Sequence, residues 1–256
     1  MCGRYAASRD PDDLVEEFEV VDEPEQALAP SWNVAPTQDV YAVVERAPRD
    51  DKEAPPRRRL QVVRWGLVPS WAKDPAIGNR MINARMETVH EKPAFRRAFA
   101  SRRALLPADG YFEWYGEVKG KKQPFFIHPS DGGVLAMAGL YELWRDPSVA
   151  EDADVDPWLW SVTVLTTSAT DDVGRIHDRM PLLVEQSRYA EWLDPAVDDP
   201  DRLRGLLVPA APGRLTAYPV DKAVNNVRND APELVEPLPL ESEPADAVGP
   251  AQDGLF

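Results

Sequence analysis

The stretch ALLPADGYFEWY, residues 104–115, contains two of the short apolar runs that decide the fold. Both ALLPA (104–108) and YFEWY (111–115) consist mainly of aliphatic and aromatic side chains, which favour strands. Five further runs of this kind occur along the chain: DVYAVVER (39–46), LQVVRW (60–65), PFFIH (124–128), VLAMAGLYEL (134–143) and WLWSVTVLTT (158–167). Their spacing and their content of Val, Phe, Tyr and Trp predict a strongly bent, barrel-like mixed β-sheet core.

Helical patterns are fewer than strand patterns. The segment DPDDLVEEF (10–18) predicts a helix with Pro in its first turn and acidic residues near its N-terminus. Three other segments have helical patterns: KPAFRRAFA (92–100), SRYAEWLD (187–194) and DRLRGLL (201–207). Because these helices are scattered among runs of strands, we expect an α+β fold in which the helices are peripheral.

Two charged segments have the composition of surface insertions. Residues 45–59 are rich in Pro and charge, and residues 145–157 are acidic with few large apolar side chains. The last segment, 236–256, is acidic and Pro-rich, a composition typical of disorder. We therefore expect one domain over residues 1–235, with the two insertions on its surface and a disordered tail.

The composition argues against membrane and metal-binding classes. No apolar run approaches the roughly 20 residues that span a bilayer, and the first 30 residues lack the apolar segment of a signal peptide. We expect a cytoplasmic monomer without membrane association. Cys2 is the only cysteine and His90, His128 and His177 have no paired spacing, so we expect neither a metal nor a cofactor.

The net charge of −15 argues against a nucleic-acid partner until its distribution is considered. Residues 52–122 contain 16 Lys and Arg against 7 Asp and Glu, a net charge of +9 that leaves −24 for the flanking segments. Such asymmetry indicates either nucleic-acid binding or a solvated basic face. The acidic excess, with 22 Arg and only 7 Lys, is typical of halophilic proteins, in which salt screens self-repulsion.

Cys2 directly follows the initiator methionine. Methionine is readily removed before so small a residue, and Cys2 would then carry a thiol of pKa about 8.5 and an α-amine of pKa about 7.7–8.0. Both groups are partly deprotonated near neutral pH. An isolated cysteine at this position could equally be incidental, so the rest of the chain must decide.

Five ordered motifs resemble those of the SOS-response-associated peptidase (SRAP) family. These are MCGRY (1–5), WNVAPTQ (32–38), WGLVPSWAKDP (65–75) with MINARMETV (81–89), ALLPADGYFEWY (104–115) and TTSATDDVGRIHDRMPLLV (166–184). The match runs from Cys2 to about Val235. The resemblance implies a DNA-damage-response protein that shields abasic sites in single-stranded DNA by covalent attachment. It also implies removal of its own Met1 and an abasic-site lyase activity.

The chemistry of Cys2 agrees with this implication. The open form of an abasic site presents an aldehyde, to which the α-amine can add with loss of water to form a Schiff base. The neighbouring thiol can then close a five-membered thiazolidine ring, and high effective molarity favours this intramolecular step. A cysteine is needed because one residue must supply both nucleophiles.

The resemblance implies catalytic roles for Cys2, Asn83, Glu113 and His177. Burial among aromatic neighbours would raise the pKa of Glu113 and suit it to general acid–base catalysis. Strand alternation alone also permits a surface position for Glu113. The resemblance implies that His177 opens the sugar ring or shuttles a proton and that Asn83 positions the substrate, although a structural His and a buried turn Asn are the common alternatives.

Five residues are candidates for DNA binding: Arg4, Arg85, Trp71, Thr166 and Pro36. Arg4 and Arg85 could clamp phosphates or pair with carboxylates, for example Arg85 with the nearby Glu87. Trp71 and the segment that ends at Pro36 could stack against or wedge between unpaired bases. The resemblance places Thr166 near the DNA backbone.

Two other functions are compatible with the same features. An N-terminal-nucleophile amidohydrolase would also use Cys2, but its fold stacks two antiparallel sheets between helical layers, and this chain is poor in helices. A non-catalytic module could bind DNA ends through the basic segment alone.

Overall fold

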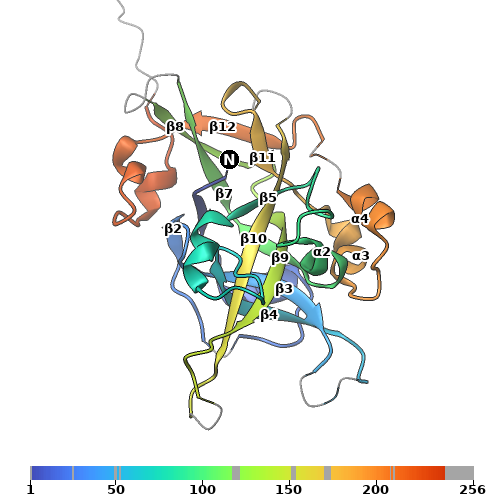
Figure 1. The fold of residues 1–256 in the computed structure, drawn as a ribbon. Helices are drawn as coiled ribbons and strands as arrows, with labels where there is room; N and C mark the ends of the chain where they lie inside the picture. Colours follow the sequence, from blue (N-terminus) through green and yellow to red (C-terminus); the bar gives the residue numbers. More distant parts are fainter. Residues whose placement is uncertain are drawn as a thin grey trace, which may run out of the picture.

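The computed structural model describes residues 2–24, 26–48, 51, 53–116, 122–150, 154–169, 174–207, 209 and 211–239. Its core is a closed barrel of five strands in the order β10-β4-β3-β6-β9, in which β9 pairs with β10 (Figure 1). The β10–β4 pair is parallel and the other barrel pairs are antiparallel. The barrel strands are β3 (Asp39–Arg46), β4 (Arg57–Trp65), β6 (Arg103–Ala108), β9 (Leu135–Arg145) and β10 (Trp158–Ser168). The predicted barrel-like mixed sheet is thus confirmed.

A second, antiparallel sheet of five strands has the order β12-β8-β7-β1-β2. Only Asp109 separates β6 from β7, so the chain passes directly from the barrel into this sheet. Figure 1 shows β8 and β12 beyond one end of the barrel, at the same end as the N-terminus. The strands are β1 (Tyr5–Ala7), β2 (Ser31–Val34), β7 (Gly110–Tyr115), β8 (Gln123–Pro129) and β12 (Leu215–Pro219).

Two three-residue strands border the second half of β10. β5 (Asn83–Arg85) pairs parallel with Val164–Thr166, and β11 (Arg179–Pro181) pairs antiparallel with Thr166–Ser168. The sequence patterns did not indicate either strand. Their pairing brings the motifs 81–89 and 166–184 together at one end of β10.

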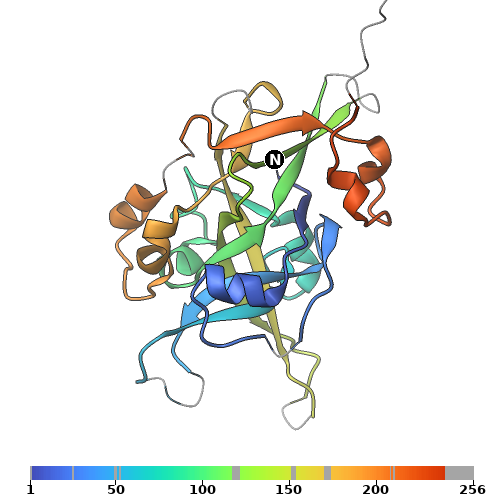
Figure 2. The ribbon, with the colours of Figure 1, turned by 180° about the vertical axis from the view of Figure 1, so that it is seen from behind.

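The helices lie on the periphery, as predicted. The α-helices are α1 (Pro11–Glu17), α2 (Arg96–Ser101), α3 (Tyr189–Leu193) and α4 (Pro200–Leu206). The 3-10 helices are η1 (Pro75–Arg80), η3 (Gln186–Arg188), η4 (Lys222–Asn225) and η5 (Pro232–Val235). The Asp10 side chain accepts from the Asp12 backbone N–H and caps α1, as the predicted pattern requires. Figure 2 shows α1 on the side of the barrel opposite to the view of Figure 1.

The barrel strands are apolar on both faces because each face packs on a different core. In β3, Val40, Ala42 and Val44 belong to a cluster shared with Trp65 and Cys2, whereas Tyr41 and Val43 pack with the helices. Strands that are buried on both faces carry nearly continuous apolar runs. This explains why the barrel strands stand out in the sequence.

Five arginines of the basic segment 52–122 make contacts within the fold. Arg103 is 1% exposed and donates to the carbonyls of Phe99, Ala100, Trp192 and Asp194, which ties α2 to α3. Burial lowers the pKa of Arg103 to about 10. Other arginines of the segment form ion pairs: Arg57 and Arg59 with Asp22, Arg58 with Glu19 and Glu45, and Arg102 with Glu142. These five arginines are therefore engaged in contacts within the fold.

The predicted insertions are smaller than expected. Arg46 ends β3 and Arg57 begins β4, so in the first insertion only 47–56 connects the two strands. The second connects β9 to β10 over 146–157, close to the predicted bounds. Within the predicted tail, Leu238 donates its backbone N–H to Pro219, while residues 240–256 lie outside the described part of the chain.

The closed barrel differs from the two stacked sheets expected of an N-terminal-nucleophile amidohydrolase. In the described part of the chain, every helix is too short or too polar to cross a membrane.

Candidate active site

Strand pairing brings the N-terminal segment alongside Glu113. Tyr5 of β1 pairs with Tyr111 of β7, and the backbone N–H of Phe112 donates to the Arg4 carbonyl at 2.9 Å. Because the strands run antiparallel, the residues that precede Tyr5 continue alongside those that follow Tyr111. Glu113 thus comes close enough to Cys2 for its charge to affect the thiol.

The Cys2 thiol is completely buried, in the barrel core cluster with Tyr5, Trp65 and Tyr111. Burial raises the pKa of the thiol well above its ordinary range, and the negative charge of Glu113 raises it further. In the chain that still carries Met1, burial thus favours the protonated thiol, and reaction through sulfur then requires a group that accepts its proton. A partly deprotonated thiol on Cys2 after removal of Met1 stays a prediction.

Glu113 faces the interior and is 3% exposed. This resolves the ambiguity that strand alternation left open. Burial raises the pKa of its carboxyl, while the charge of His177 lowers it by a smaller amount. A carboxyl with a raised pKa can act as a proton donor at higher pH than an exposed Glu.

Asn83 holds the backbone of Cys2. Its Nδ2 donates to the Cys2 carbonyl at 2.7 Å. Asn83 is fixed in turn by the pairing of β5 with Val164 and by Trp65, whose indole Nε1 donates to the neighbouring Ile82 carbonyl at 2.9 Å. The side-chain Oδ1 of Asn83 is buried and has no hydrogen-bond partner among the described residues, so it remains available as an acceptor.

His177 lies just before β11, with a side chain that is 30% exposed. Its Nδ1 accepts the backbone N–H of Arg179 at 3.0 Å, which leaves the proton of the neutral ring on Nε2. The Asp178 carboxylate lies 2.9 Å from the same Nδ1.

Arg179, on β11, contacts one of the DNA-binding candidates, Thr166, and a residue near another, Arg85. Its guanidinium donates two hydrogen bonds to the Glu87 carboxylate, at 2.6 and 3.0 Å, and a third to the Thr166 carbonyl at 2.7 Å. Glu87 is therefore bound by Arg179, while Arg85 is exposed. Thr166 is only 1% exposed and its hydroxyl contacts Arg179, and its expected place near the DNA backbone stays a prediction.

Arg4 is half-buried and reaches the C-terminal segment. Its Nη1 donates to the Asn33 side chain at 2.7 Å and to the Val224 carbonyl at 2.9 Å, and its guanidinium lies 5.9 Å from the Trp114 ring centroid. Arg4 has no carboxylate partner among the described residues. Asn33, which is 1% exposed, donates to three carbonyls of residues 224–229 and so fixes this segment against β2.

Trp71 is 59% exposed, as a base-stacking surface requires, and Pro36 is half-buried. The loop that carries Trp71 is held by the close approach of Gly66 and Gly78. Gly66 has a φ of +125°, and a Cβ there would lie 2.6 Å from the Gly78 carbonyl oxygen. Glycine is therefore required at this contact.

Four residues of the site were not predicted as such: Asn33, Arg179, Tyr5 and Tyr111. The hydroxyls of both tyrosines are buried without a hydrogen-bond partner among the described residues. Burial raises the pKa of both phenols, and a charge on Cys2 would raise it further. All four lie within or next to the recognised motifs, but only their tertiary contacts distinguish them. Across the described ranges, no group of three or more His, Cys, Asp and Glu could hold a metal ion.

Known proteins share the sequence and the fold of this chain. The family model described as SOS response associated peptidase (SRAP) matches residues 1–227. Abasic site processing protein YoqW of Bacillus subtilis (strain 168) is 39% identical over 238 residues, which cover 92% of this chain and 99% of YoqW. Abasic site processing protein YedK of Escherichia coli (strain K12) is 32% identical, over 93% of this chain and 100% of YedK. A crystal structure of a Bacteroides thetaiotaomicron protein shares the fold, with a TM-score of 0.75, 22% identity and coverage of 93% of this chain and 100% of that one.

Proposed function

Because this chain belongs to the SOS response associated peptidase (SRAP) family, we propose that it processes abasic sites in single-stranded DNA through a covalent bond to Cys2. The observation that carries the proposal is the position of Cys2. Its carbonyl is held by Asn83, and its thiol lies within the electrostatic range of the buried Glu113. Residues 1–235 would act as one catalytic unit.

Removal of Met1 comes first in the proposed mechanism, because only a free α-amine on Cys2 can form a Schiff base. The amine adds to the aldehyde carbon of the open abasic site. Glu113, whose pKa is raised by burial, donates a proton to the departing hydroxyl, which leaves as water. His177 assists ring opening or proton transfer.

Ring closure uses the protonated thiol. Sulfur adds to the imine carbon while the thiol proton passes to the imine nitrogen, so that the thiazolidine forms without a further leaving group. Glu113, as a carboxylate after the first step, can relay this proton. Water exclusion around the buried thiol favours closure of the ring over hydrolysis of the imine.

The imine also offers a second route. It acidifies the adjacent sugar carbon and permits β-elimination, which cleaves the strand. The balance between shielding and lyase activity then depends on how fast sulfur closes the ring. DNA would be held by Arg4 and Arg85, with Trp71 and Pro36 against the bases, and Arg179 and Thr166 shaping the surface behind them.

Incubation with abasic single-stranded DNA tests the proposal. We expect a denaturation-resistant complex for the wild-type chain, none for Cys2→Ala, and none with an undamaged oligonucleotide. Intact mass should show that active protein begins at Cys2. An active adduct that retains Met1, or an equal adduct from Cys2→Ala, would exclude the mechanism. Glutamine as substrate distinguishes an amidohydrolase, which would release ammonia.

A further inference from the structure

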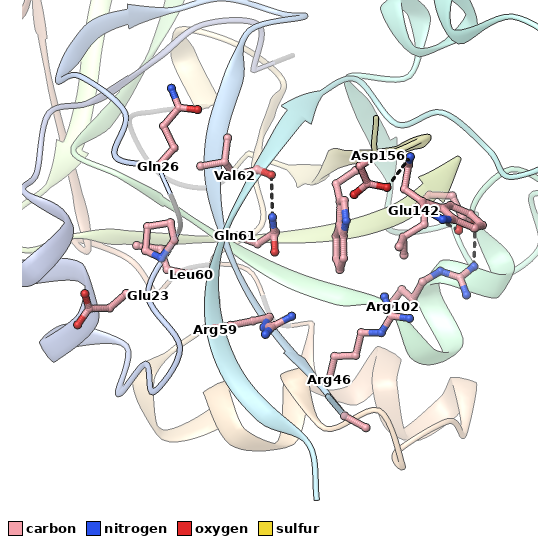
Figure 3. A pocket seen from close by; sticks show the side chains of 15 residues that line it. Glu23, Gln26, Arg46, Arg59, Leu60, Gln61, Val62, Arg102, Glu142 and Asp156 are labelled. Carbon is pink, nitrogen blue, oxygen red and sulfur yellow. Dashed lines mark hydrogen bonds and ion pairs between the residues drawn. The ribbon is translucent and has the colours of Figure 1, made fainter. Parts of the chain in front are cut away.

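A cavity of about 700 Å³ lies between the β3–β4 and β9–β10 hairpins (Figure 3). It is separate from the Cys2 site. Trp158, at the start of β10, lines the cavity, whereas Thr166 of the same strand lies beside Arg179 at the other end. Eight residues of strand span about 26 Å at 3.3 Å per residue.

Aromatic side chains form one wall of this cavity. Trp158 is 39% exposed, and the ring of Trp160 stacks on Tyr141 with a centroid distance of 5.4 Å and an interplanar angle of 19°. The guanidinium of Arg46 lies 5.5 Å from the Trp160 ring centroid. The Tyr141–Trp160 stack and the cation–π contact hold Arg46 in place before any ligand arrives.

The cavity also holds a cationic group with unused donors. The Arg46 guanidinium forms no hydrogen bond or ion pair within the described ranges of the chain, and its contact is with the Trp160 ring. Arg102 is paired through Nη2 with Glu142 at 2.8 Å. Figure 3 shows the guanidinium groups of Arg46, Arg59 and Arg102 on the same side of the cavity.

The acidic lining residues are mostly neutralised or lie at the mouth. Glu142 is bound by Arg102, and its second oxygen accepts the backbone N–H of Leu143. Glu23 and Asp156 are exposed. The cavity therefore presents indole rings and the unpaired guanidinium of Arg46.

We propose that this cavity binds a nucleotide, with the base against Trp158 and the phosphate at Arg46. A volume of about 700 Å³ lies within the range of roughly 300–1,000 Å³ usual for small-molecule sites. An inorganic anion would leave the indole surface unused, and an apolar ligand would leave the Arg46 guanidinium without an anionic partner. A base with a phosphate uses both surfaces.

The nucleotide can be free or part of a DNA strand, and titration calorimetry separates these sources. The probes are dAMP, deoxyadenosine, inorganic phosphate and an undamaged single-stranded dodecamer. We expect saturable binding of dAMP, and binding at least tenfold weaker for deoxyadenosine and for phosphate. Tight dodecamer binding that Arg46→Gln weakens identifies a strand, whereas dAMP binding without dodecamer binding identifies a free nucleotide.

Two variants and two controls complete the test. Trp158→Ala and Arg46→Gln should each weaken dAMP binding at least tenfold. Arg57→Gln alters an exposed arginine on β4 that does not line the cavity and should have no effect. Cys2→Ala should bind dAMP as the wild type does, so this result is independent of the proposed crosslink. Three results would overturn the inference: no binding of dAMP to the wild type, wild-type affinity for dAMP in both cavity variants, or loss of dAMP binding in Cys2→Ala.

Discussion

The Asn83 side chain donates a 2.7 Å hydrogen bond to the backbone carbonyl of Cys2. This contact joins the start of the chain to β5, which the parallel pairing with β10 anchors in turn. The position of the Cys2 backbone, and hence of any amine attached to it, is thereby set by the barrel. Precise placement of reacting groups contributes strongly to rate.

Asn83→Ala should slow adduct formation. The substitution leaves the Cys2 carbonyl without this donor, a loss of about 1–3 kcal/mol for a buried polar group. If this free energy is lost from the positioning of the Cys2 backbone, the single-turnover rate with abasic DNA drops by about 5-fold to 150-fold. Asn79→Ala, an exposed asparagine on η1, is the control and should react at the wild-type rate. Equal rates for Asn83→Ala and wild type would show that the contact is only structural.

Glu113→Gln should make the protein more stable and less active. Burial raises the folded-state pKa of Glu113 above its unfolded value, so between these two values the folded chain holds the extra proton. The free energy of unfolding therefore falls as pH rises through this window. Gln cannot ionise, so above the window we expect a Tm increase of about 2–4 °C for each kcal/mol recovered.

Calorimetry at pH 5 and pH 8 measures this effect. The Tm difference between Glu113→Gln and wild type should grow with pH. Glu142→Gln is the contrasting control, because it removes a buried carboxylate that is paired with Arg102 and should lower the Tm. A Glu113→Gln variant that is less stable at pH 8 than wild type would contradict a raised pKa.

The barrel could be predicted from the sequence because its strands are long and buried on both faces. β3 has the predicted bounds 39–46, and the other four barrel strands overlap their predicted runs. The strands that were missed are short or partly exposed, such as β5 and β11 with three residues each. Such segments become strands only because β10 offers them hydrogen-bonding partners, which is tertiary information.

In the candidate site, too, the sequence predicted some features and tertiary packing decided the others. The family motifs predict catalytic roles for Cys2, Asn83, Glu113 and His177, but local pattern could not decide which face Glu113 occupies. Pairing of β1 with β7 decides it. Cys2 burial, and with it the raised pKa of the thiol, also depends on packing between segments far apart in the sequence.

Gly78→Ala should loosen the loop that carries Trp71. A Cβ on Gly78 would overlap the backbone oxygen of Gly66, so the two segments must separate. We expect reduced stability, faster proteolysis between residues 66 and 82, and weaker binding of single-stranded DNA. Gly205→Ala in α4 is the matched control, since its Cβ would meet no atom within 4 Å and should cost nothing or stabilise the helix by up to about 1 kcal/mol. If Gly78→Ala binds single-stranded DNA as tightly as the wild type, Trp71 does not take part in DNA recognition.

Concentrated salt should not abolish the adduct. Non-covalent binding through several phosphates weakens by orders of magnitude as salt rises, whereas a covalent product persists. At about 1 M KCl the Debye length is about 3 Å, which screens the repulsion expected from a net charge of −15. We therefore expect adduct yield and Tm to hold or rise up to molar KCl. A yield that is highest in dilute buffer and lost at high salt would contradict the halophilic interpretation.

Cys2→Ser separates the two nucleophiles of one residue. The α-amine remains once Met1 is removed, so the imine still forms, but a hydroxyl closes the ring far more slowly than sulfur. We expect a heat-stable adduct and little strand cleavage from wild type. Cys2→Ser should give more cleavage and an adduct that survives only after borohydride reduction. Glu113→Gln and His177→Ala serve as comparisons, because both should slow the two outcomes together if they act before the routes diverge. A heat-stable adduct from Cys2→Ser without reductant would place the bond on another atom, and the thiazolidine would have to be abandoned.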